Sequence, residues 1–224
     1  MYKNVVKRVI DIVCSFAGIL ILSIPMLIVA VIIKLQDSGP AIFTQKRVGQ
    51  KKNGEINYFK LYKFRSMKMS TPHDIPTHQL ESPEQYLLPC GRFIRRFSID
   101  ELPQLLNILK GDMSIIGPRP ALWNQEDLVA EREKYGANDC RPGLTGWAQI
   151  NGRDELEIPV KARYDGEYAR KLNEGGIAAF GFDCRCFFGT VPKVFRADGV
   201  VEDCAGETKQ QQDTSSKHKK TLMK

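Results

Sequence analysis

Two adjacent carboxylates, Asp100 and Glu101, lie in the stretch Ser98-Ile99-Asp100-Glu101-Leu102-Pro103-Gln104. A serine followed three residues later by a glutamate is a capping box, which predicts that a helix begins here. Acidic residues in a first helical turn are common, so the pair could serve only the cap. Because arginines stand nearby at positions 95, 96 and 119, the pair also indicates a site for phosphates and a metal ion.

The two carboxylates suit two different tasks. The positive end of a helix dipole and the neighbouring Arg95 would both favour the ionised form of Asp100. An ionised carboxylate can attack phosphorus and form an acyl phosphate. Glu101 would point to another side of the helix, where it could hold Mg²⁺ against a substrate diphosphate. The leucines that follow would bury the opposite face of this helix and fix the pair in place.

Two further motifs could bind anions. Arg119 stands between Pro118 and Pro120, so its backbone is largely set before any ligand arrives, which favours bidentate phosphate binding. The segment 141–146 combines Arg141, a Pro-Gly turn and the hydroxyl of Thr145, and its amides could cradle an anion. Taken singly, each motif also fits an ordinary solvated connection.

A run of cations lies in a strand-like segment. Lys60, Lys63 and Arg65 alternate with Leu61, Tyr62 and Phe64. We expect a strand here to place the three cations on one face, although a solvated sheet face has the same composition.

Composition narrows the class of protein. The chain has 224 residues and a formal net charge of +7, which suits one domain plus an anchor. So modest a basic excess does not favour nucleic acid, and it fits an anionic membrane face or phosphorylated ligands. The six cysteines form no CxxC pair and have no histidine cluster beside them, so we expect reduced thiols in a cytosol-facing protein.

Residues 12–33 carry no charge and are long enough to cross a bilayer as a permanent anchor. Pro25 interrupts the run, and Ser23 could take up backbone groups freed at a kink. Basic residues flank both ends, whereas a spanning helix should concentrate them on one side. This pattern favours a bent, re-entrant helix, with a spanning helix as the alternative. Asp11 could be neutralised by Lys7 or Arg8 one turn away.

Other elements are expected from local patterns. Strands are expected at 41–45 and 56–67 around a turn at 51–54, and helices at 99–110, 126–134 and 159–171. Residues 70–90 carry four prolines and predict a loop. The aromatic and basic stretch 180–196 fits either an interfacial amphipathic helix or a core helix. We therefore expect an anchor at 1–36, a catalytic domain at 37–204 and a disordered basic tail at 205–224.

Several collinear motifs together give the chain a specific resemblance. From about residue 7 to 195 it resembles the bacterial sugar transferases known as monotopic phosphoglycosyl transferases, in their small form with a catalytic domain only. The matching motifs are Lys-Arg-x-x-Asp at 7–11, Ile-Phe-Thr-Gln at 42–45, Tyr-Lys-Phe-Arg-Ser-Met at 62–67, the dyad stretch 98–104, Leu-Lys-Gly-Asp-Met-Ser at 109–114, Gly-Pro-Arg-Pro at 117–120, 141–146, and Asn-Gly-Arg at 151–153.

The resemblance implies a fold, a reaction and residue roles. The fold is α+β and mostly helical, with a re-entrant N-terminal membrane hairpin at Ser23 and Pro25, short strands and interfacial amphipathic helices. The reaction moves a sugar 1-phosphate from a UDP-sugar to undecaprenyl phosphate and releases UMP. Asp100 is implied as the covalent nucleophile and Glu101 as the Mg²⁺ ligand. The phosphate-binding or nucleotide-binding residues are implied to be Lys63, Arg65, Arg95, Arg119, Arg141, Thr145 and Arg153.

The same resemblance implies the cytoplasmic face of the bacterial inner membrane, contact with membrane lipids and a role in starting a capsule, exopolysaccharide or other glycoconjugate. A homodimer stays open. Direct transfer without a covalent intermediate, with the dyad holding metal or acting as a base, is one rival. A non-catalytic scaffold for glycosyltransferases is the other. The donor sugar is not specified, although 123–125 could contact it. Residues 70–90 exceed the length expected of the smallest members and could shape the sugar pocket, and the glycines between 173 and 182 interrupt an expected helix.

Overall fold

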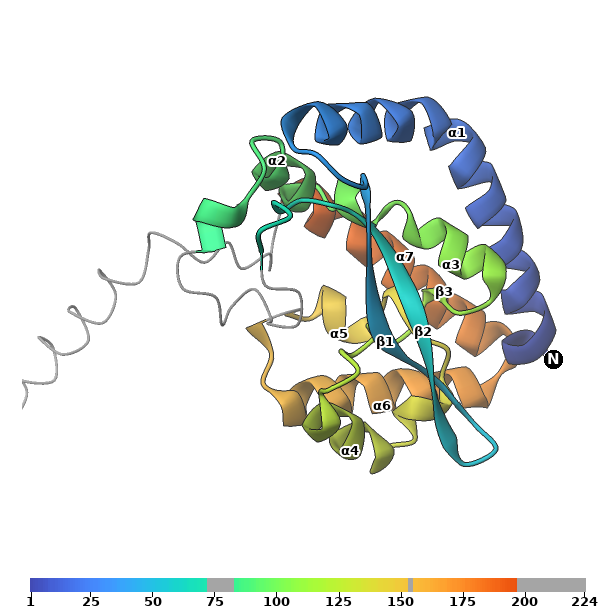
Figure 1. Cartoon of the computed structure of the whole chain (residues 1–224). Helices are drawn as coiled ribbons and strands as arrows, with labels where there is room; N and C mark the ends of the chain where they lie inside the picture. The colour runs from blue at the N-terminus through green and yellow to red at the C-terminus, as the bar shows by residue number, and fades with distance from the viewer. Residues whose placement is uncertain (72–82, 153–154, 197–224) are drawn as a thin grey trace, which may run out of the picture.

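The computed structural model describes residues 1–71, 83–152 and 155–196. The middle of the proline-rich segment, Arg153 and the tail 205–224 lie outside these residues. The described chain is α+β and mostly helical, as predicted (Figure 1). Its main elements are α1 (Lys7–Gln36), β1 (Ile42–Lys52), β2 (Glu55–Phe64), α2 (Gly91–Arg96), α3 (Gln104–Lys110), β3 (Ser114–Ile116), α4 (Glu126–Glu133), β4 (Gly143–Thr145), α5 (Trp147–Ile150), α6 (Ile158–Glu174) and α7 (Gly176–Arg196).

Helix α1 is long and bent. It rises along one side of the molecule and turns over the top before the chain enters β1 (Figure 1). Pro25 lies inside this helix and cannot donate a backbone hydrogen bond, which is the usual cause of a sharp kink. The Ser23 hydroxyl donates to the Leu20 carbonyl, 2.8 Å away, close to that proline. By length and composition, the apolar N-terminal helix could cross a membrane.

One side of α1 packs on the domain along both of its halves. Ile19 and Leu22 join a cluster around Leu105 and Ile108, whereas Ile33 is buried in a second cluster with Phe64. The other side is apolar and exposed, a surface of the kind that contacts lipid. The exposed apolar residues of α1 are Val9, Ile12, Val13, Phe16, Leu20, Ile21, Ile24, Leu27, Ile28, Val31, Ile32 and Leu35.

The base of α1 is tied down by polar groups. Lys7 Nζ lies 2.8 Å from the buried carboxylate of Asp183 in α7. Arg8 donates to the carbonyls of Ile108 and Leu109 at the end of α3. Asp11 instead accepts from the Ser114 hydroxyl and the Ile115 amide. The expectation that Lys7 or Arg8 neutralises Asp11 through a direct ion pair is therefore wrong. Each of the three side chains binds a partner in another part of the fold.

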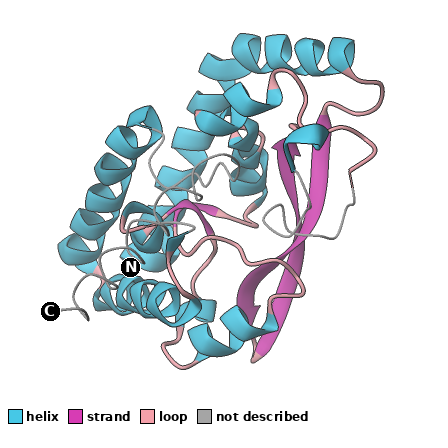
Figure 2. Ribbon diagram, turned by 90° about the vertical axis from the view of Figure 1, so that its left-hand side faces the viewer, coloured by secondary structure: helices cyan, strands magenta, loops and turns pink. Residues whose placement is uncertain are grey.

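Strands β1 and β2 form a long antiparallel hairpin, which lies along one side of the molecule while most helices gather on the other (Figure 2). Its turn is at Asn53 and Gly54, whose φ angles are 53° and 85°, as a tight two-residue hairpin turn requires. The hairpin confirms the predicted pair of strands, with a longer first strand. Because side chains alternate along a strand, Lys60 and Lys63 lie on opposite faces, and Arg65 lies beyond the end of β2. The prediction of three cations on one face is wrong.

The predicted helix 99–110 is divided. A 3-10 turn, η4 (Ile99–Glu101), precedes α3, and Pro103 stands at the N-cap of α3. Ser98 has a left-handed backbone, with φ of 54°, and within the described chain its side chain makes no capping hydrogen bond. The capping box is therefore not formed. The predicted end at Gly111 is confirmed, because this residue adopts the left-handed conformation with φ of 94°.

The later helices follow the predicted pattern with one break. Helices α4 and α6 confirm the helices expected at 126–134 and 159–171. Helix α6 ends just before Gly175, where φ is 71°, and α7 begins at the next residue. The aromatic residues of α7 divide between the core and the surface. Phe182 packs against the main core, whereas Phe180, Phe187 and Phe188 are exposed.

Candidate active site

The 3-10 turn η4 places Asp100 and Glu101 in a nearly closed environment. Only 8% of Asp100 and 6% of Glu101 is exposed to solvent. Ser98, with its left-handed backbone, stands between α2 and η4, and Pro103 lies two residues after Glu101, so the dyad lies on a short turn between two helices. Burying two adjacent carboxylates is costly unless positive charge lies beside them.

Two cations from separate parts of the sequence supply that charge. Lys63, near the end of β2, places Nζ 2.9 Å from Glu101 Oε1 and 3.6 Å from Asp100 Oδ2. Arg119 binds Glu101 through both terminal nitrogens, with Nη2 2.7 Å from Oε1 and Nη1 3.4 Å from Oε2. Glu101 is thus firmly held, whereas Asp100 has the looser contact with Lys63.

The charge state of Asp100 reflects a competition. Burial raises the pKa of its carboxyl group, and Lys63 lowers that pKa more than any other neighbouring cation. Glu101 raises the Asp100 pKa further, while Arg95 and Arg119 lower it. The expectation that the environment favours ionised Asp100 is therefore wrong in its net direction, because the cost of desolvation exceeds the attraction of the cations.

The 117–120 motif is fixed by the 141–146 motif, which lies directly beside it. The Gly117 amide donates to the Thr145 carbonyl, and the Gly143 amide donates to the Pro118 carbonyl, both at 2.8 Å. A Cβ atom at Gly143 would lie 2.1 Å from the Gly117 nitrogen, so only glycine allows this approach. The two sequence motifs therefore form one unit that holds the backbone on both sides of Arg119.

A buried ion pair supports Arg119 from behind. Arg132 in α4 places Nη2 2.6 Å from Asp165 Oδ2 in α6, and both side chains are buried. The same Nη2 donates to the Arg119 carbonyl at 3.0 Å. Arg132 and Asp165 thus connect the core of the domain to the residue that binds Glu101, a connection that the sequence did not reveal.

The other predicted site residues divide into three groups. Arg95 in α2 is half-buried and close enough to lower the pKa of Asp100. Arg65 and Arg141 do not join the dyad. Arg65 pairs with Asp37 after the end of α1, while Arg141 is near Arg8 and Asp11, and burial lowers its pKa. Arg153 lies outside the described residues.

Beside the dyad is a cavity of about 340 Å³. Its polar lining includes Glu101, Arg119 and Thr145, and the rest of its wall is mainly apolar. Helix α7 contributes one side of this wall, although the sequence indicated only an interfacial helix or a core helix there. The lining residues are Phe97, Ser98, Glu101, Leu102, Ile115, Arg119, Leu144, Thr145, Gln149, Ile150, Phe187, Thr190, Val191 and Lys193.

The dyad provides oxygen ligands of the type that Mg²⁺ prefers. Mg²⁺ commonly uses one or two carboxylates together with substrate phosphates, so Asp100 and Glu101 fit such an ion in type and number. Within the described residues there is no group of three or more histidine, cysteine, aspartate or glutamate side chains that could hold a metal alone. An ion at the dyad would therefore share its coordination with a substrate.

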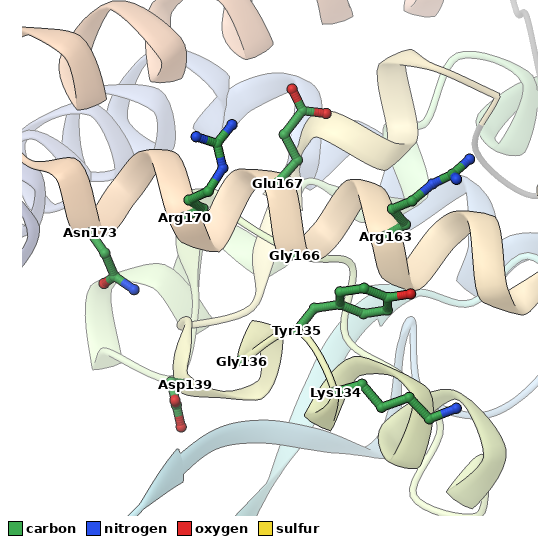
Figure 3. Close-up of a pocket in the computed structure, with 9 residues that line it drawn as sticks. All are labelled: Lys134, Tyr135, Gly136, Asp139, Arg163, Gly166, Glu167, Arg170 and Asn173. Carbon is green, nitrogen blue, oxygen red and sulfur yellow. The ribbon is translucent and has the colours of Figure 1, made fainter.

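A second hollow, of about 590 Å³, lies between α6 and the turn after α4 (Figure 3). Its charged side chains diverge: Glu167 and Arg170 rise from one side of α6, while Lys134 and Asp139 point elsewhere. Lys134 pairs with Glu131, and Arg170 pairs with Glu174. Because its charges neither converge nor reach the dyad, this hollow has no evident part in the site.

The cysteines are free thiols as far as the structure describes them. Burial raises the pKa of Cys140 to about 11 and that of Cys186 to about 12, so neither thiol supplies a thiolate at neutral pH. The carboxylate dyad is therefore the better candidate for nucleophilic chemistry.

Comparison with known proteins assigns the chain to a family. The bacterial sugar transferase family model matches residues 2–197. The undecaprenyl-phosphate galactose phosphotransferase of Salmonella typhimurium is 35% identical over 87% of this chain, and the UDP-glucose:undecaprenyl-phosphate glucose-1-phosphate transferase of Escherichia coli is 36% identical over 86%. The match covers 41% of the length of each of these two proteins.

A shorter relative matches along nearly its whole length. The exopolysaccharide production protein PSS of Rhizobium leguminosarum is 37% identical over 84% of this chain and 94% of its own length. The dyad, the two cations that hold it and the paired 117–120 and 141–146 motifs all lie within the region matched by the family model. The chain therefore belongs to the bacterial sugar transferase family.

Proposed function

We propose that this protein transfers a sugar 1-phosphate from a UDP-sugar to undecaprenyl phosphate and so starts the synthesis of a polysaccharide. The observation that carries the proposal is the buried Asp100-Glu101 pair, held by Lys63 and Arg119 beside a cavity that Glu101 and Arg119 line. Relatives named for undecaprenyl-phosphate sugar phosphotransfer support the same class of reaction.

In the proposed first step Asp100 is the nucleophile. A carboxylate oxygen of Asp100 bonds to the phosphorus that bears the sugar, the bond from that phosphorus to the bridging oxygen breaks, and UMP leaves with the electron pair. Asp100 suits this task better than Glu101, because its contact with Lys63 is 3.6 Å long, whereas Glu101 is bound by two cations at 2.9 and 2.7 Å. Lys63 lowers the pKa of Asp100 against the effect of burial, which favours the ionised form needed for attack.

In the proposed second step an oxygen of the acceptor phosphate attacks the same phosphorus. The acyl-phosphate bond breaks, the polyprenyl diphosphate sugar is released, and Asp100 returns to a carboxylate. Arg119 and Lys63 would provide positive charge for the substrate phosphates in both steps. Mg²⁺, for which Glu101 is the proposed ligand, would neutralise the charge of the donor diphosphate when bound.

A re-entrant α1 fits this reaction. Both ends of the helix return to the same domain: Lys7 pairs with Asp183 in α7, and Asp37, just after the helix, pairs with Arg65 just after β2. A charged domain that holds both ends of α1 would keep both ends on one side of a bilayer. We place that domain at the cytoplasmic face of the inner membrane, where a soluble donor can meet a lipid acceptor.

The test measures UMP release by the detergent-solubilised protein with a panel of UDP-sugars, Mg²⁺ and undecaprenyl phosphate. We expect turnover with one or a few donors and its loss in Asp100→Asn. The matched control Asp127→Asn, which changes an exposed aspartate of α4, should retain wild-type turnover. Equal turnover in wild type and Asp100→Asn would contradict the proposed nucleophile, and no turnover with any donor would favour a scaffold.

A further inference from the structure

We propose that the cavity beside the dyad binds the phosphate-bearing end of the acceptor lipid, with α7 forming the wall against its first isoprene units. This inference rests on the proposed function, because it assigns a place to the acceptor of that reaction. Its occupant is a polyprenyl phosphate, which combines one anionic group with a branched hydrocarbon chain.

The lining of the cavity has polar groups that suit a phosphate and apolar groups that suit a hydrocarbon chain. The cavity touches Glu101 and Arg119, so a phosphate bound at Arg119 would lie next to the dyad. Apolar side chains make up most of the rest of the wall; they are Phe97, Leu102, Ile115, Leu144, Ile150, Phe187 and Val191. Small-molecule pockets commonly occupy about 300–1,000 Å³, so a cavity of about 340 Å³ suits one end of the lipid and not its whole chain.

The same wall continues onto the outer surface of the molecule. Phe187 and Val191 lie one turn apart on α7, line the cavity, and remain 48% and 43% exposed. Phe188, the next residue of α7, and Phe180, about two turns earlier, are also exposed. An amphipathic helix with this surface can lie at the membrane boundary, so hydrocarbon could pass from lipid into the cavity without crossing water.

The inner side of α7 is fixed by a contact with the segment 141–146, which holds the backbone beside Arg119. The hydroxyls of Thr190 and Thr145 lie 2.6 Å apart, which joins α7 to β4. Since β4 also carries the carbonyl that binds Gly117, this contact sets the position of the α7 wall relative to Arg119. The cavity is thus a built part of the fold between the cation site and the apolar helix.

The apolar wall fits the lipid better than it fits the donor. A nucleotide sugar carries many hydroxyl and carbonyl groups, and each would lose its water on entering an apolar pocket without a replacement hydrogen bond. A hydrocarbon chain gains free energy from the same transfer. We therefore place the donor on the Asp100 side of the cations and the lipid on the α7 side.

The test compares Phe187→Ala with Phe188→Ala. Both residues are exposed phenylalanines of α7 in mutual contact, but only Phe187 lines the cavity. For Phe187→Ala we expect the KM for undecaprenyl phosphate to rise about five- to tenfold, because the truncation removes apolar contact with the lipid. The donor half-reaction, measured as the phosphosugar adduct formed without acceptor, should be unchanged. Phe188→Ala should leave both quantities near wild type.

Equal changes in the acceptor KM for the two variants, or no change in either, would overturn the inference while leaving the proposed function intact.

A second measurement does not depend on turnover: a polyprenyl phosphate with a photoreactive group in its first isoprene unit is crosslinked to the wild-type protein. Labelling of the 176–193 peptide that Phe187→Ala reduces would support the lipid site. Labelling confined to α1, or unchanged in Phe187→Ala, would overturn it. A wild-type protein that neither forms an adduct nor releases UMP would count against the proposed function itself.

Discussion

At the scale of single residues, Lys63 is the cation with the largest effect on the pKa of Asp100, the proposed nucleophile. Burial raises the pKa of Asp100, and Lys63 is the strongest of the cations that lower it. A carboxyl group whose pKa is raised stays protonated up to a higher pH, and only its ionised form can attack phosphorus. The acid side of the pH profile should therefore depend on Lys63.

We predict that Lys63→Gln moves the acid limb of the kcat/KM profile for the UDP-sugar to higher pH and lowers kcat/KM at neutral pH. Removing the cation leaves the Asp100 pKa even further above its usual value. The control is Lys60→Gln, because Lys60 is exposed and lies on the opposite face of β2. Identical pH profiles for wild type and Lys63→Gln would contradict this role.

Arg132 offers a second residue-scale prediction, on stability. Replacing Arg132 with alanine leaves Asp165 buried without its partner and removes the donor to the Arg119 carbonyl. Loss of one partner of a buried pair typically costs about 3–5 kcal/mol of unfolding free energy. The exposed pair between Arg170 and Glu174 provides the comparison, since Arg170→Ala should cost less than about 1 kcal/mol. Chemical denaturation measures both, and equal effects would show that Arg132 has no special structural role.

At the scale of elements, the pairing of β3 with β4 determines where Arg119 lies. The strands are short, and the approach of Gly143 to Gly117 leaves no room for a side chain. Their contact therefore couples the stability of this small sheet to the geometry of the dyad.

We predict that Gly143→Ala lowers both the free energy of unfolding and the rate of adduct formation, because its Cβ would meet the Gly117 backbone at 2.1 Å. Gly181→Ala in α7 is the matched control. Its Cβ would have no atom of the described chain within 4 Å, and replacing a helical glycine with alanine stabilises a helix by about 0.5–1 kcal/mol. Thermal unfolding and intact mass measure the two effects. A Gly143→Ala protein as stable and active as wild type would rule out the tight approach.

Elements set by local chemistry could be predicted from the sequence. Asn53 and Gly54 predict the hairpin turn, and Gly111 predicts the end of α3, because each residue tolerates a left-handed backbone. The dyad turn could not be predicted in this way. The sequence Ser-x-x-Glu fits a capping box, yet in the fold Ser98 adopts a left-handed backbone without capping, and Glu101 binds two cations that are distant in the sequence.

The roles of residues that depend on partners distant in the sequence could not be predicted either. Arg65 and Arg141 occupy motifs as suggestive as that of Arg119, but one pairs with Asp37 and the other lies near Arg8. The wall formed by α7 was missed because about 85 residues separate Glu101 from Phe187 in the chain. The position of Lys60 could have been predicted correctly, since strict alternation along a strand already separates it from Lys63.

At the scale of the whole molecule, α1 and α7 together present the apolar surfaces through which the domain would meet a membrane. The bend in α1 and the return of both its ends to the domain support a hairpin that enters and leaves on one face (Figure 1). A homodimer stays a prediction from the family resemblance.

We predict that both ends of α1 face the cytoplasm. In a cysteine-free background, Asn4→Cys and Ser38→Cys should each react with a membrane-impermeant maleimide in inverted vesicles and stay unlabelled in intact spheroplasts. Adding Pro25→Ala, which restores a backbone donor inside the helix, should increase the share of molecules with the two ends on opposite sides. Labelling of only one end in inverted wild-type vesicles would establish a spanning helix.

The central claim is that Asp100 carries the sugar phosphate during the reaction. Its most direct test is the intact mass of the solubilised protein after incubation with UDP-sugars and Mg²⁺ in the absence of lipid acceptor. We predict a mass increase equal to one sugar phosphate with the correct donor, absent in Asp100→Asn and lost when undecaprenyl phosphate is added to the wild type. No adduct with any donor, together with UMP release that begins only when the acceptor is added, would contradict the covalent mechanism and establish direct transfer.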